Sequence, residues 1–289
     1  PRGSRRSGGT LPAMDEPRYR DVLAGGVRLR VREEGTGAPV LYLHGIHLDH
    51  STWSELCSAL GPAFHHVMPD LPGFGESEKP PAVRFAYDVD AFTDAVVDLY
   101  GGLGLGRAVV VGQGLGGTIA ITLAARHPEL VSKLVLIDAA PNALEPSLPT
   151  RVAAVPILGG LVVKQLLGRA GFRSIFRRSL LGPDSRVDTA RIDRYYELFN
   201  TPASRGSALA TMRATADARA IIALTPRIET PTLVIWGRHD RVCPAAFGQR
   251  LSRQIRGARL ELVDAGHCPQ EERPQEVGAA TLRFLGEDR

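Results

Sequence analysis

The residues of this sequence that are best placed to do chemistry lie around a glycine-rich turn. Val109, Val110 and Val111 form a β-branched run that ends at Gly112, and an apolar helical pattern follows from Ile119. We therefore expect a strand, a tight turn and a helix. Two kinds of chemistry use such a turn. One is binding of a dinucleotide through backbone N–H groups, and the other is presentation of a nucleophile above a sheet.

The glycine spacing fits both kinds of site. Gly112, Gly114 and Gly117 match G-x-G-x-x-G, and Asp138 ends the next apolar strand about 20 residues later, where a ribose-binding acid would stand. The frame of a nucleophile elbow, G-x-S-x-G, is also present through Gly112, Gly114 and Gly116. In that frame, glycine occupies the position of the serine.

The surrounding elements alternate between strands and helices. We predict strands over 19–23, 27–33, 39–43, 65–69, 134–137, 232–236 and 260–263, besides the valine run. We predict helices over 51–60 with Ser51 as the N-cap, and over 89–103, 116–126, 245–255 and 275–284. This alternation predicts an α/β fold with a mostly parallel, doubly wound sheet that begins with an antiparallel hairpin.

The β signal disappears from Pro141 to about Arg227, where the sequence is helical, arginine-rich and interrupted by proline and glycine. We predict that 141–227 is a helical cap inserted between late strands of a core formed by 14–140 and 228–289. The cap arginines should form a mostly solvated face, of which one or two could bind an anionic substrate. Residues 1–13 begin with a sequence typical of a protease-site remnant, and we expect them to be a disordered tag.

Composition excludes several classes of function. The net charge of the 289 residues is only +4, and basic residues do not interleave with aromatics, so nucleic acid is not an expected partner. No apolar run is long enough to span a membrane. Three scattered cysteines indicate a reducing, cytoplasmic location. We expect a monomer or homodimer that acts on a small molecule without a cofactor.

Five motifs in order resemble those of the α/β-hydrolase superfamily, from about Tyr19 to the C-terminus. They are His44-Gly45, Asp70-Leu71-Pro72-Gly73-Phe74-Gly75-x-Ser77, the elbow frame, Gly237-Arg238-His239-Asp240-Arg241-Val242-Cys243-Pro244 and Ala265-Gly266-His267-Cys268-Pro269-Gln270-Glu271-Glu272-Arg273-Pro274. The sequence is most similar to the cap-bearing group that contains epoxide hydrolases, C–C bond hydrolases and enol-lactonases. A dinucleotide fingerprint belongs in the first βα unit and leaves the later motifs unexplained. We therefore interpret Asp138 as the polar end of a strand.

The resemblance assigns roles to individual residues. It implies that His267 is the catalytic base and that Asp240 orients it, because a carboxylate fixes the imidazole tautomer and stabilises the imidazolium. Backbone N–H groups of Leu115 and Ile46 would form the oxyanion hole.

We also predict that His44, Gly45, His47 and Gln113 contact the substrate. His44, His47 and His50 form an H-x-x-H-x-x-H repeat, but no cysteine or carboxylate partner is apparent in the sequence, so we do not expect a metal site. Ser77 should have a structural role in its loop.

Gly114 is the departure from the family pattern. Without a side-chain nucleophile, no acyl-enzyme can form at this position. Glycine also relieves the backbone strain that an elbow imposes on other residues, so the fold should tolerate it. We favour a natural enzyme whose His267–Asp240 dyad and oxyanion hole perform general-base chemistry on a small organic molecule, such as a secondary metabolite. Elimination by a lyase, cyclisation, decarboxylation and non-covalent hydrolysis all fit.

Two alternatives stay open. One is an ordinary serine hydrolase (esterase, lactonase or C–C hydrolase) inactivated by replacement of its native serine with Gly114. The other is a non-catalytic ligand-binding protein on a hydrolase scaffold. The presence of His267, Asp240 and His44-Gly45 argues against the second alternative. A protein that only binds a ligand does not need a base, an orienting acid and an oxyanion loop together.

Overall fold

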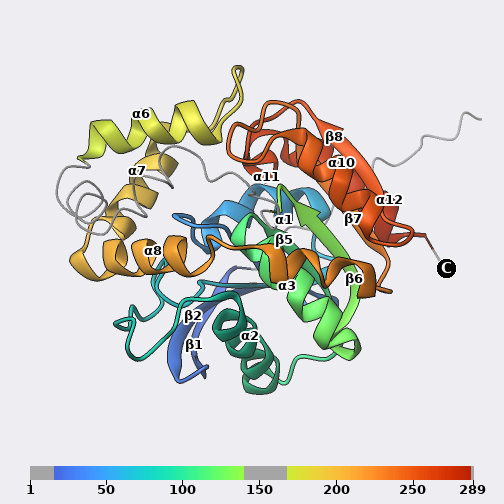
Figure 1. Cartoon of the computed structure of the whole chain (residues 1–289), viewed down its shortest axis with the longest axis horizontal. Helices are drawn as coiled ribbons and strands as arrows, with labels where there is room; N and C mark the ends of the chain where they lie inside the picture. The colour runs from blue at the N-terminus through green and yellow to red at the C-terminus, as the bar shows by residue number, and fades with distance from the viewer. Residues whose placement is uncertain (1–15, 140–167, 288–289) are drawn as a thin grey trace, which may run out of the picture.

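A computed structural model describes residues 16–139 and 168–287 of the chain, and its centre is one eight-stranded sheet (Figure 1). The spatial order of the strands is β1-β2-β4-β3-β5-β6-β7-β8. Their bounds are Arg18–Ala24 (β1), Val27–Glu34 (β2), Ala38–Leu43 (β3), Phe64–Pro69 (β4), Ala108–Gln113 (β5), Val131–Ile137 (β6), Thr232–Gly237 (β7) and Arg259–Val263 (β8).

The sheet is mostly parallel. Strand β2 pairs antiparallel with β1 and β4, and the remaining pairs from β4 to β8 are parallel. The predicted mostly parallel sheet with a leading antiparallel hairpin is therefore confirmed.

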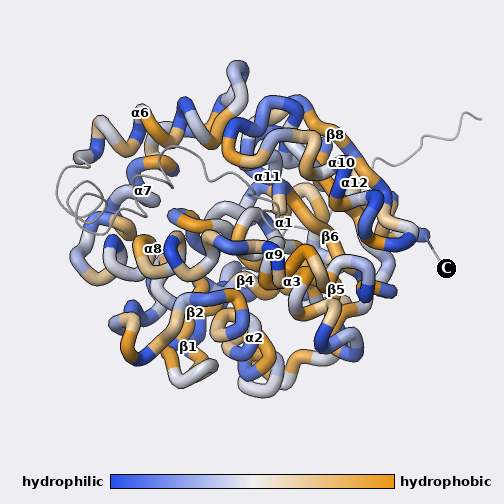
Figure 2. Tube along the Cα trace, in the orientation of Figure 1, coloured by the Kyte–Doolittle hydropathy of each residue, from blue (hydrophilic) through white to orange (hydrophobic). Residues whose placement is uncertain are grey.

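Helices cover both faces of the sheet. Helices α2 (Val89–Leu103), α3 (Leu115–Arg126) and α10 (Ala245–Gln254) contribute to one hydrophobic cluster, and α1 (Ser54–Leu60) and α12 (Pro274–Leu285) to another. Along β5, Val110 belongs to the first cluster, and Val109 and Val111 to the second. A strand buried on both faces needs a continuous apolar run, which explains the three successive valines. Figure 2 shows hydrophobic residues gathered along α3 and its neighbouring strands.

The predicted elements lie where the sequence places them, with one local difference at the helix predicted over 51–60. A 3₁₀ turn, η1 (His50–Trp53), comes first, and α1 starts only at Ser54. Asp49 rather than Ser51 is the N-cap, because the Asp49 carboxylate accepts the Ser51 N–H at 2.7 Å. Aspartate and serine are similarly good caps, so propensity alone could not place the start of this segment.

The described residues between β6 and β7 form a group that we call the inserted helices. They are α6 (Arg169–Leu180), α7 (Thr189–Phe199), α8 (Pro202–Ala214) and α9 (Arg219–Ile222), followed by a 3₁₀ turn, η4 (Thr225–Arg227). In Figure 1, α6, α7 and α8 lie together to one side of the sheet. The predicted cap bounds, 141–227, remain a prediction because 140–167 lie outside the described residues, as does the predicted tag, 1–13.

Ion pairs and aromatic contacts join the inserted helices to each other and to the core. Arg191 of α7 donates to the Ser51 carbonyl oxygen at 2.8 Å, and Nε of Arg194 lies 3.3 Å from Oδ2 of Asp49. Phe172 of α6 stacks on Phe199 of α7 with ring centroids 5.6 Å apart. In the described part of the chain, no helix is both long enough and apolar enough to cross a membrane.

Candidate active site

Gly114 joins β5 to α3 in a backbone conformation that L-residues rarely adopt, with φ 54° and ψ −115°. A Cβ at this position would meet nothing closer than 3.4 Å. At Gly116, by contrast, a Cβ would lie 1.9 Å from the Leu43 carbonyl oxygen. Glycine is thus required at 116 by the close approach of α3 to β3, whereas the space at 114 accommodates a side chain.

His267 and Asp240 lie together at the carboxyl ends of the strands. Nδ1 of His267 lies 2.7 Å from Oδ2 of Asp240, and both residues are 6% exposed. The other carboxylate oxygen of Asp240 accepts the N–H groups of Val242 at 2.7 Å and Cys243 at 2.9 Å. The carboxylate is therefore held by the backbone and holds the imidazole in turn.

The second ring nitrogen of His267 faces the elbow. Nε2 of His267 lies 3.4 Å from the position that a Cβ on Gly114 would take. The backbone of His267 is anchored on two sides, because its N–H donates to the Leu180 carbonyl at 2.7 Å and its own carbonyl accepts from Nε2 of Gln113 at 2.8 Å. The structure thus brings His267, Asp240 and Gly114 into one site.

Asp138 approaches the same carboxylate from the end of β6. Ligand atoms of Asp138, Asp240 and His267 lie within 4.8 Å of one another. Oδ1 of Asp138 accepts the Gly237 N–H at 2.9 Å, and its Oδ2 has no hydrogen-bond partner among the described residues. Burial and then the charge of Asp240 raise the pKa of Asp138 well above its ordinary value. The raised pKa favours the protonated form of Asp138, which lies close to the Asp240 carboxylate.

From the sequence, Asp138 was interpreted only as the polar end of a strand, and its proximity to Asp240 was not predicted. Asp138 and Asp240 are brought together by the pairing of β6 with β7. A polar residue directly after a buried strand was the available signal, since parallel strands end at one edge of a sheet.

His44 and Gly45 do not line the cavity next to His267. His44 is fully buried, its Nδ1 donates to the Gly45 carbonyl at 2.8 Å, and its Nε2 accepts the Leu71 N–H at 2.9 Å. A Cβ on Gly45 would lie 2.1 Å from Oε1 of Gln113. The structure places His44 as a support between two loops and Gly45 at a close packing contact, and their predicted contact with the substrate stays a prediction.

His47 does line the cavity, next to Ile46. Its backbone has a positive φ of 68°, and its ring packs edge-on against Phe199 with centroids 5.0 Å apart. Burial lowers the pKa of His47 to about 4, so the ring is neutral at pH 7. Its Nδ1 is buried without a hydrogen-bond partner among the described residues.

A cavity of about 250 Å³ opens above Gly114. Its described walls include the predicted oxyanion residues, the end of β5 and the end of α6. Helix α8, the turn that follows it, and the loops that carry Asp240 and His267 also contribute to the described lining. The lining residues are Ile46, His47, Leu48, Val89, Gln113, Gly114, Leu115, Thr118, Ile175, Ser179, Leu180, Met212, Thr215, Ala216, Asp217, Ala218, Ile221, Val242, Cys243 and His267. Leu115 begins α3, so its N–H has no acceptor within the helix.

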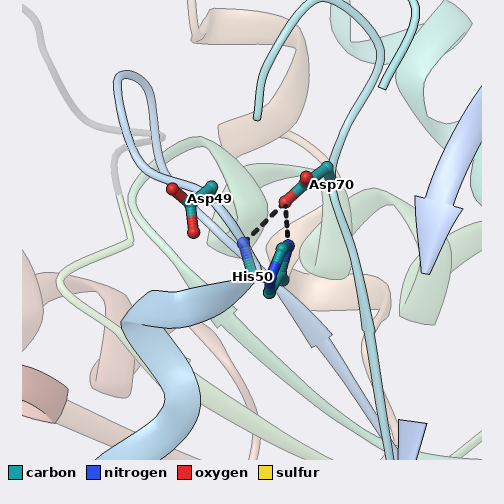
Figure 3. Close-up of side chains that lie close together, drawn as sticks. All are labelled: Asp49, His50 and Asp70. Atoms are coloured by element: carbon teal, nitrogen blue, oxygen red, sulfur yellow. Dashed lines mark hydrogen bonds and ion pairs between the residues drawn. The ribbon is translucent and has the colours of Figure 1, made fainter. Parts of the chain in front are cut away.

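The histidine repeat does not converge on a common point. His50 pairs instead with Asp70: the backbone N and Nδ1 of His50 lie 2.6 and 2.9 Å from Oδ1 of Asp70 (Figure 3). Asp49 stands beside them, and ligand atoms of the three residues lie within 4.8 Å. Burial favours the neutral acid, but the hydrogen bond and charge of His50 outweigh it and lower the pKa of Asp70.

Asp70 of this cluster also makes hydrogen bonds that position the loop after β4. Oδ2 of Asp70 accepts the Glu76 N–H at 2.6 Å, and its carbonyl oxygen accepts the Ser77 hydroxyl at 2.6 Å. The Ser77 hydroxyl in turn accepts the Arg30 N–H at 2.8 Å, which agrees with its predicted structural role. We therefore interpret the cluster as a loop-positioning ion pair.

Glu271, one turn after His267, was not singled out from the sequence. Its Oε1 accepts the hydroxyl groups of Thr52 at 2.5 Å and Tyr195 at 2.7 Å. Burial raises the pKa of Glu271 to about 7. The residue thus joins the loop of His267, the η1 turn and the inserted helix α7. Its place in the last hydrolase-like motif was the only signal.

Comparisons with known proteins agree with this architecture. Residues 38–274 match the family model described as the alpha/beta hydrolase fold. This chain belongs to that family.

Its similarity to individual members extends over almost the whole chain. It is 28% identical over 286 residues to 2-hydroxymuconate semialdehyde hydrolase of a Pseudomonas species, covering 93% of this chain and 94% of that protein. A solved serine hydrolase involved in carbazole degradation superposes with a TM-score of 0.79 at 25% identity, covering 93% of this chain and 98% of that one. The enol-lactonase of Burkholderia xenovorans superposes with a TM-score of 0.80 at 24% identity, covering 93% and 100%. The last match concerns the fold alone.

Proposed function

We propose that this α/β-hydrolase-fold protein is an enzyme that works without a covalent nucleophile, through proton transfer by His267. The single observation that supports this most strongly is the orientation of the imidazole. Its Nδ1 is bonded to Asp240 and its Nε2 faces the empty side-chain position of Gly114. A base aimed at a vacant elbow leaves room for water or a substrate atom where a serine hydroxyl would otherwise lie.

The reaction would proceed by general-base catalysis. Nε2 of His267 takes a proton from a water molecule or from the substrate, and the carboxylate of Asp240 stabilises the imidazolium that forms. Negative charge that develops on a substrate oxygen is stabilised by the N–H groups of Leu115 and Ile46. The imidazolium then returns its proton to the leaving group or to the product. Non-covalent hydrolysis, elimination and cyclisation all use these steps on a small molecule.

A second function is favoured by the space at the elbow. Because a Cβ on Gly114 meets only the His267 ring at 3.4 Å and Cα of Gly45 at 3.6 Å, a serine would fit and its hydroxyl would reach His267. The chain would then be a serine hydrolase in which glycine has replaced the nucleophile. The glycine itself suits the positive φ of the elbow, and this favours the first function.

Gly114→Ser separates the two functions. The variant and the parent are assayed side by side on a panel of esters, lactones and β-dicarbonyl compounds, and are treated with a fluorophosphonate probe. Under the first function, turnover of the parent's substrate falls or stays flat in the variant. Strong labelling together with a large gain in ester hydrolysis would favour the second. The double variant Gly114→Ser/His267→Ala is the control for labelling that does not depend on the base.

A further inference from the structure

The polarity and charge of the side chains that line the cavity above Gly114 indicate which ligands it binds. We propose that the substrate is an uncharged molecule with an apolar body and one polar reacting group, and that carboxylates are excluded. The inference rests on the proposed function, because it concerns the same cavity.

Most of the described lining is hydrocarbon. The apolar side chains are Ile46, Leu48, Val89, Leu115, Ile175, Leu180, Met212, Ala216, Ala218, Ile221, Val242 and Cys243. Burying apolar surface against such walls stabilises a complex by about 25 cal/mol per Å². A body of carbon and hydrogen is therefore the part of a ligand that these walls bind.

The described walls of the cavity offer an anion no positive charge. No lysine or arginine occurs among the described lining residues, and the ring of His47 is neutral at pH 7 because its pKa is lowered to about 4. The one acidic side chain outside the dyad, Asp217, stays ionised because its hydrogen bond with Arg219 lowers its pKa to about 2. A carboxylate entering this cavity would lose its hydration without a counter-charge, which costs several kcal/mol.

Three of the polar side chains in the wall already make hydrogen bonds within the protein. Thr118 donates its hydroxyl to the Gly114 carbonyl at 3.3 Å, and Thr215 donates its own to the Thr211 carbonyl at 2.8 Å. Gln113 uses its Nε2 on the His267 carbonyl. These bonds reduce the number of wall donors available to a ligand, whereas the N–H of Leu115, next to Gly114, has no acceptor within its helix.

Several arginines of the inserted helices hold protein groups instead of facing the cavity. Arg173 pairs with Asp193 between α6 and α7, and Arg191 and Arg194 reach the loop that carries Asp49. The sequence allowed one or two cap arginines to bind an anionic substrate. These three arginines are instead engaged with protein groups.

The volume limits the size of the ligand. An apolar cavity of about 150 Å³ accommodates benzene. The 250 Å³ available here would hold one ring with a short chain, or an aliphatic body of similar size. A phenylalkyl ketone meets these requirements, since its carbonyl can lie beside His267 while its ring fills the apolar end.

A matched pair of ligands tests the proposal by binding. 4-Phenyl-2-butanone and 4-phenylbutanoate have similar size and differ in charge. Their dissociation constants are measured by calorimetry at pH 7.5 on the full chain. The ketone should bind at least about tenfold more tightly than the carboxylate. Equal affinities, tighter carboxylate binding or no ketone binding would each overturn the proposal.

A cation placed in the wall provides the second arm. Met212→Lys should reduce or reverse the preference for the ketone, and Met212→Leu should preserve it. An unchanged preference in the lysine variant would show that the ligands bind elsewhere and would contradict the proposal. Both experiments measure binding, so they test the proposed ligand class separately from the proposed function. The proposed function is tested by the loss of turnover in His267→Ala.

Discussion

Nδ1 of His267 lies 2.7 Å from Oδ2 of Asp240, and the two residues are 27 positions apart in the chain. Neither depends on position 114 for its placement. Backbone N–H groups of Val242 and Cys243 hold the carboxylate, and contacts with Leu180 and Gln113 hold the backbone of His267. The pairing of His267 with Asp240 is therefore held by contacts that do not involve position 114.

Removal of the base should abolish most of the activity. His267→Ala is expected to lower kcat by on the order of a hundredfold or more, and Asp240→Asn should also be harmful because the tautomer is no longer held. Turnover is measured on the substrate identified from the ester, lactone and β-dicarbonyl panel. His239→Ala is the matched control, because His239 is exposed and pairs with Asp264. Equal losses in the His239 and His267 variants would contradict the assignment.

Asp138 should tolerate an amide but not its removal. Burial and the charge of Asp240 raise its pKa, and its Oδ1 accepts the Gly237 N–H. An asparagine keeps this oxygen acceptor and carries no charge. We expect Asp138→Asn to keep kcat within about threefold of the parent. Asp138→Ala should lower kcat by roughly tenfold through the loss of a buried hydrogen bond.

The shape of the pH–kcat profile separates a positioning role of Asp138 from a merely structural one. Asp138→Ala should shift the pH at which kcat changes, whereas Asp138→Asn should not. If Asp138→Asn is as damaging as Asp240→Asn, Asp138 is ionised and our interpretation is wrong.

Two glycines of the elbow should differ in their tolerance of a methyl group. Gly114→Ala is expected to lower the free energy of unfolding by only about 1 to 2 kcal/mol, the cost of a positive φ. Gly116→Ala should cost about 3 kcal/mol or more, because its Cβ would overlap the Leu43 carbonyl and force α3 away from β3. Urea unfolding of both variants measures the difference. Similar costs at the two sites would show that the elbow is not as tightly packed as described.

Glu271 should make stability fall as the pH rises. Its pKa is about 7 in the folded protein and ordinarily 4.5, so the folded state keeps a proton that the unfolded chain releases. The stabilisation from this protonated form is fully present below about pH 4.5 and is lost as the pH rises through about 7. It amounts to about 3 kcal/mol, from 1.36 kcal/mol for each of the roughly two and a half pH units between the two pKa values. The groups around the carboxyl are Thr52 on η1, Arg191 and Tyr195 on α7, and Asp49.

Glu271→Gln tests this pH dependence. The variant keeps an acceptor for Thr52 and Tyr195 but cannot ionise, so its unfolding free energy should decline less between pH 5 and 8. Glu276→Gln, at an exposed position of α12, serves as the control. Parallel stability curves for the parent and Glu271→Gln would refute the prediction.

The sequence alone predicted the fold and the pairing of His267 with Asp240. Strand and helix periods, the glycine-rich turn and the order of five motifs depend on residues that are close in the chain. The predicted strands and helices therefore agree with β1 to β8 and with α2, α3, α10 and α12 within a few residues. The start of η1 differed because two neighbouring residues were suitable caps.

Only the tertiary structure decided what surrounds the dyad. The proximity of Asp138 to Asp240, the burial of His44 between two loops and the link from Glu271 to Tyr195 each depend on how elements remote in sequence pack together. The same holds for the arginines of α7, whose partners lie more than a hundred residues earlier. The residue type determines which chemistry a side chain can perform. Its charge state and its access to a ligand depend on its neighbours, which are determined by tertiary packing.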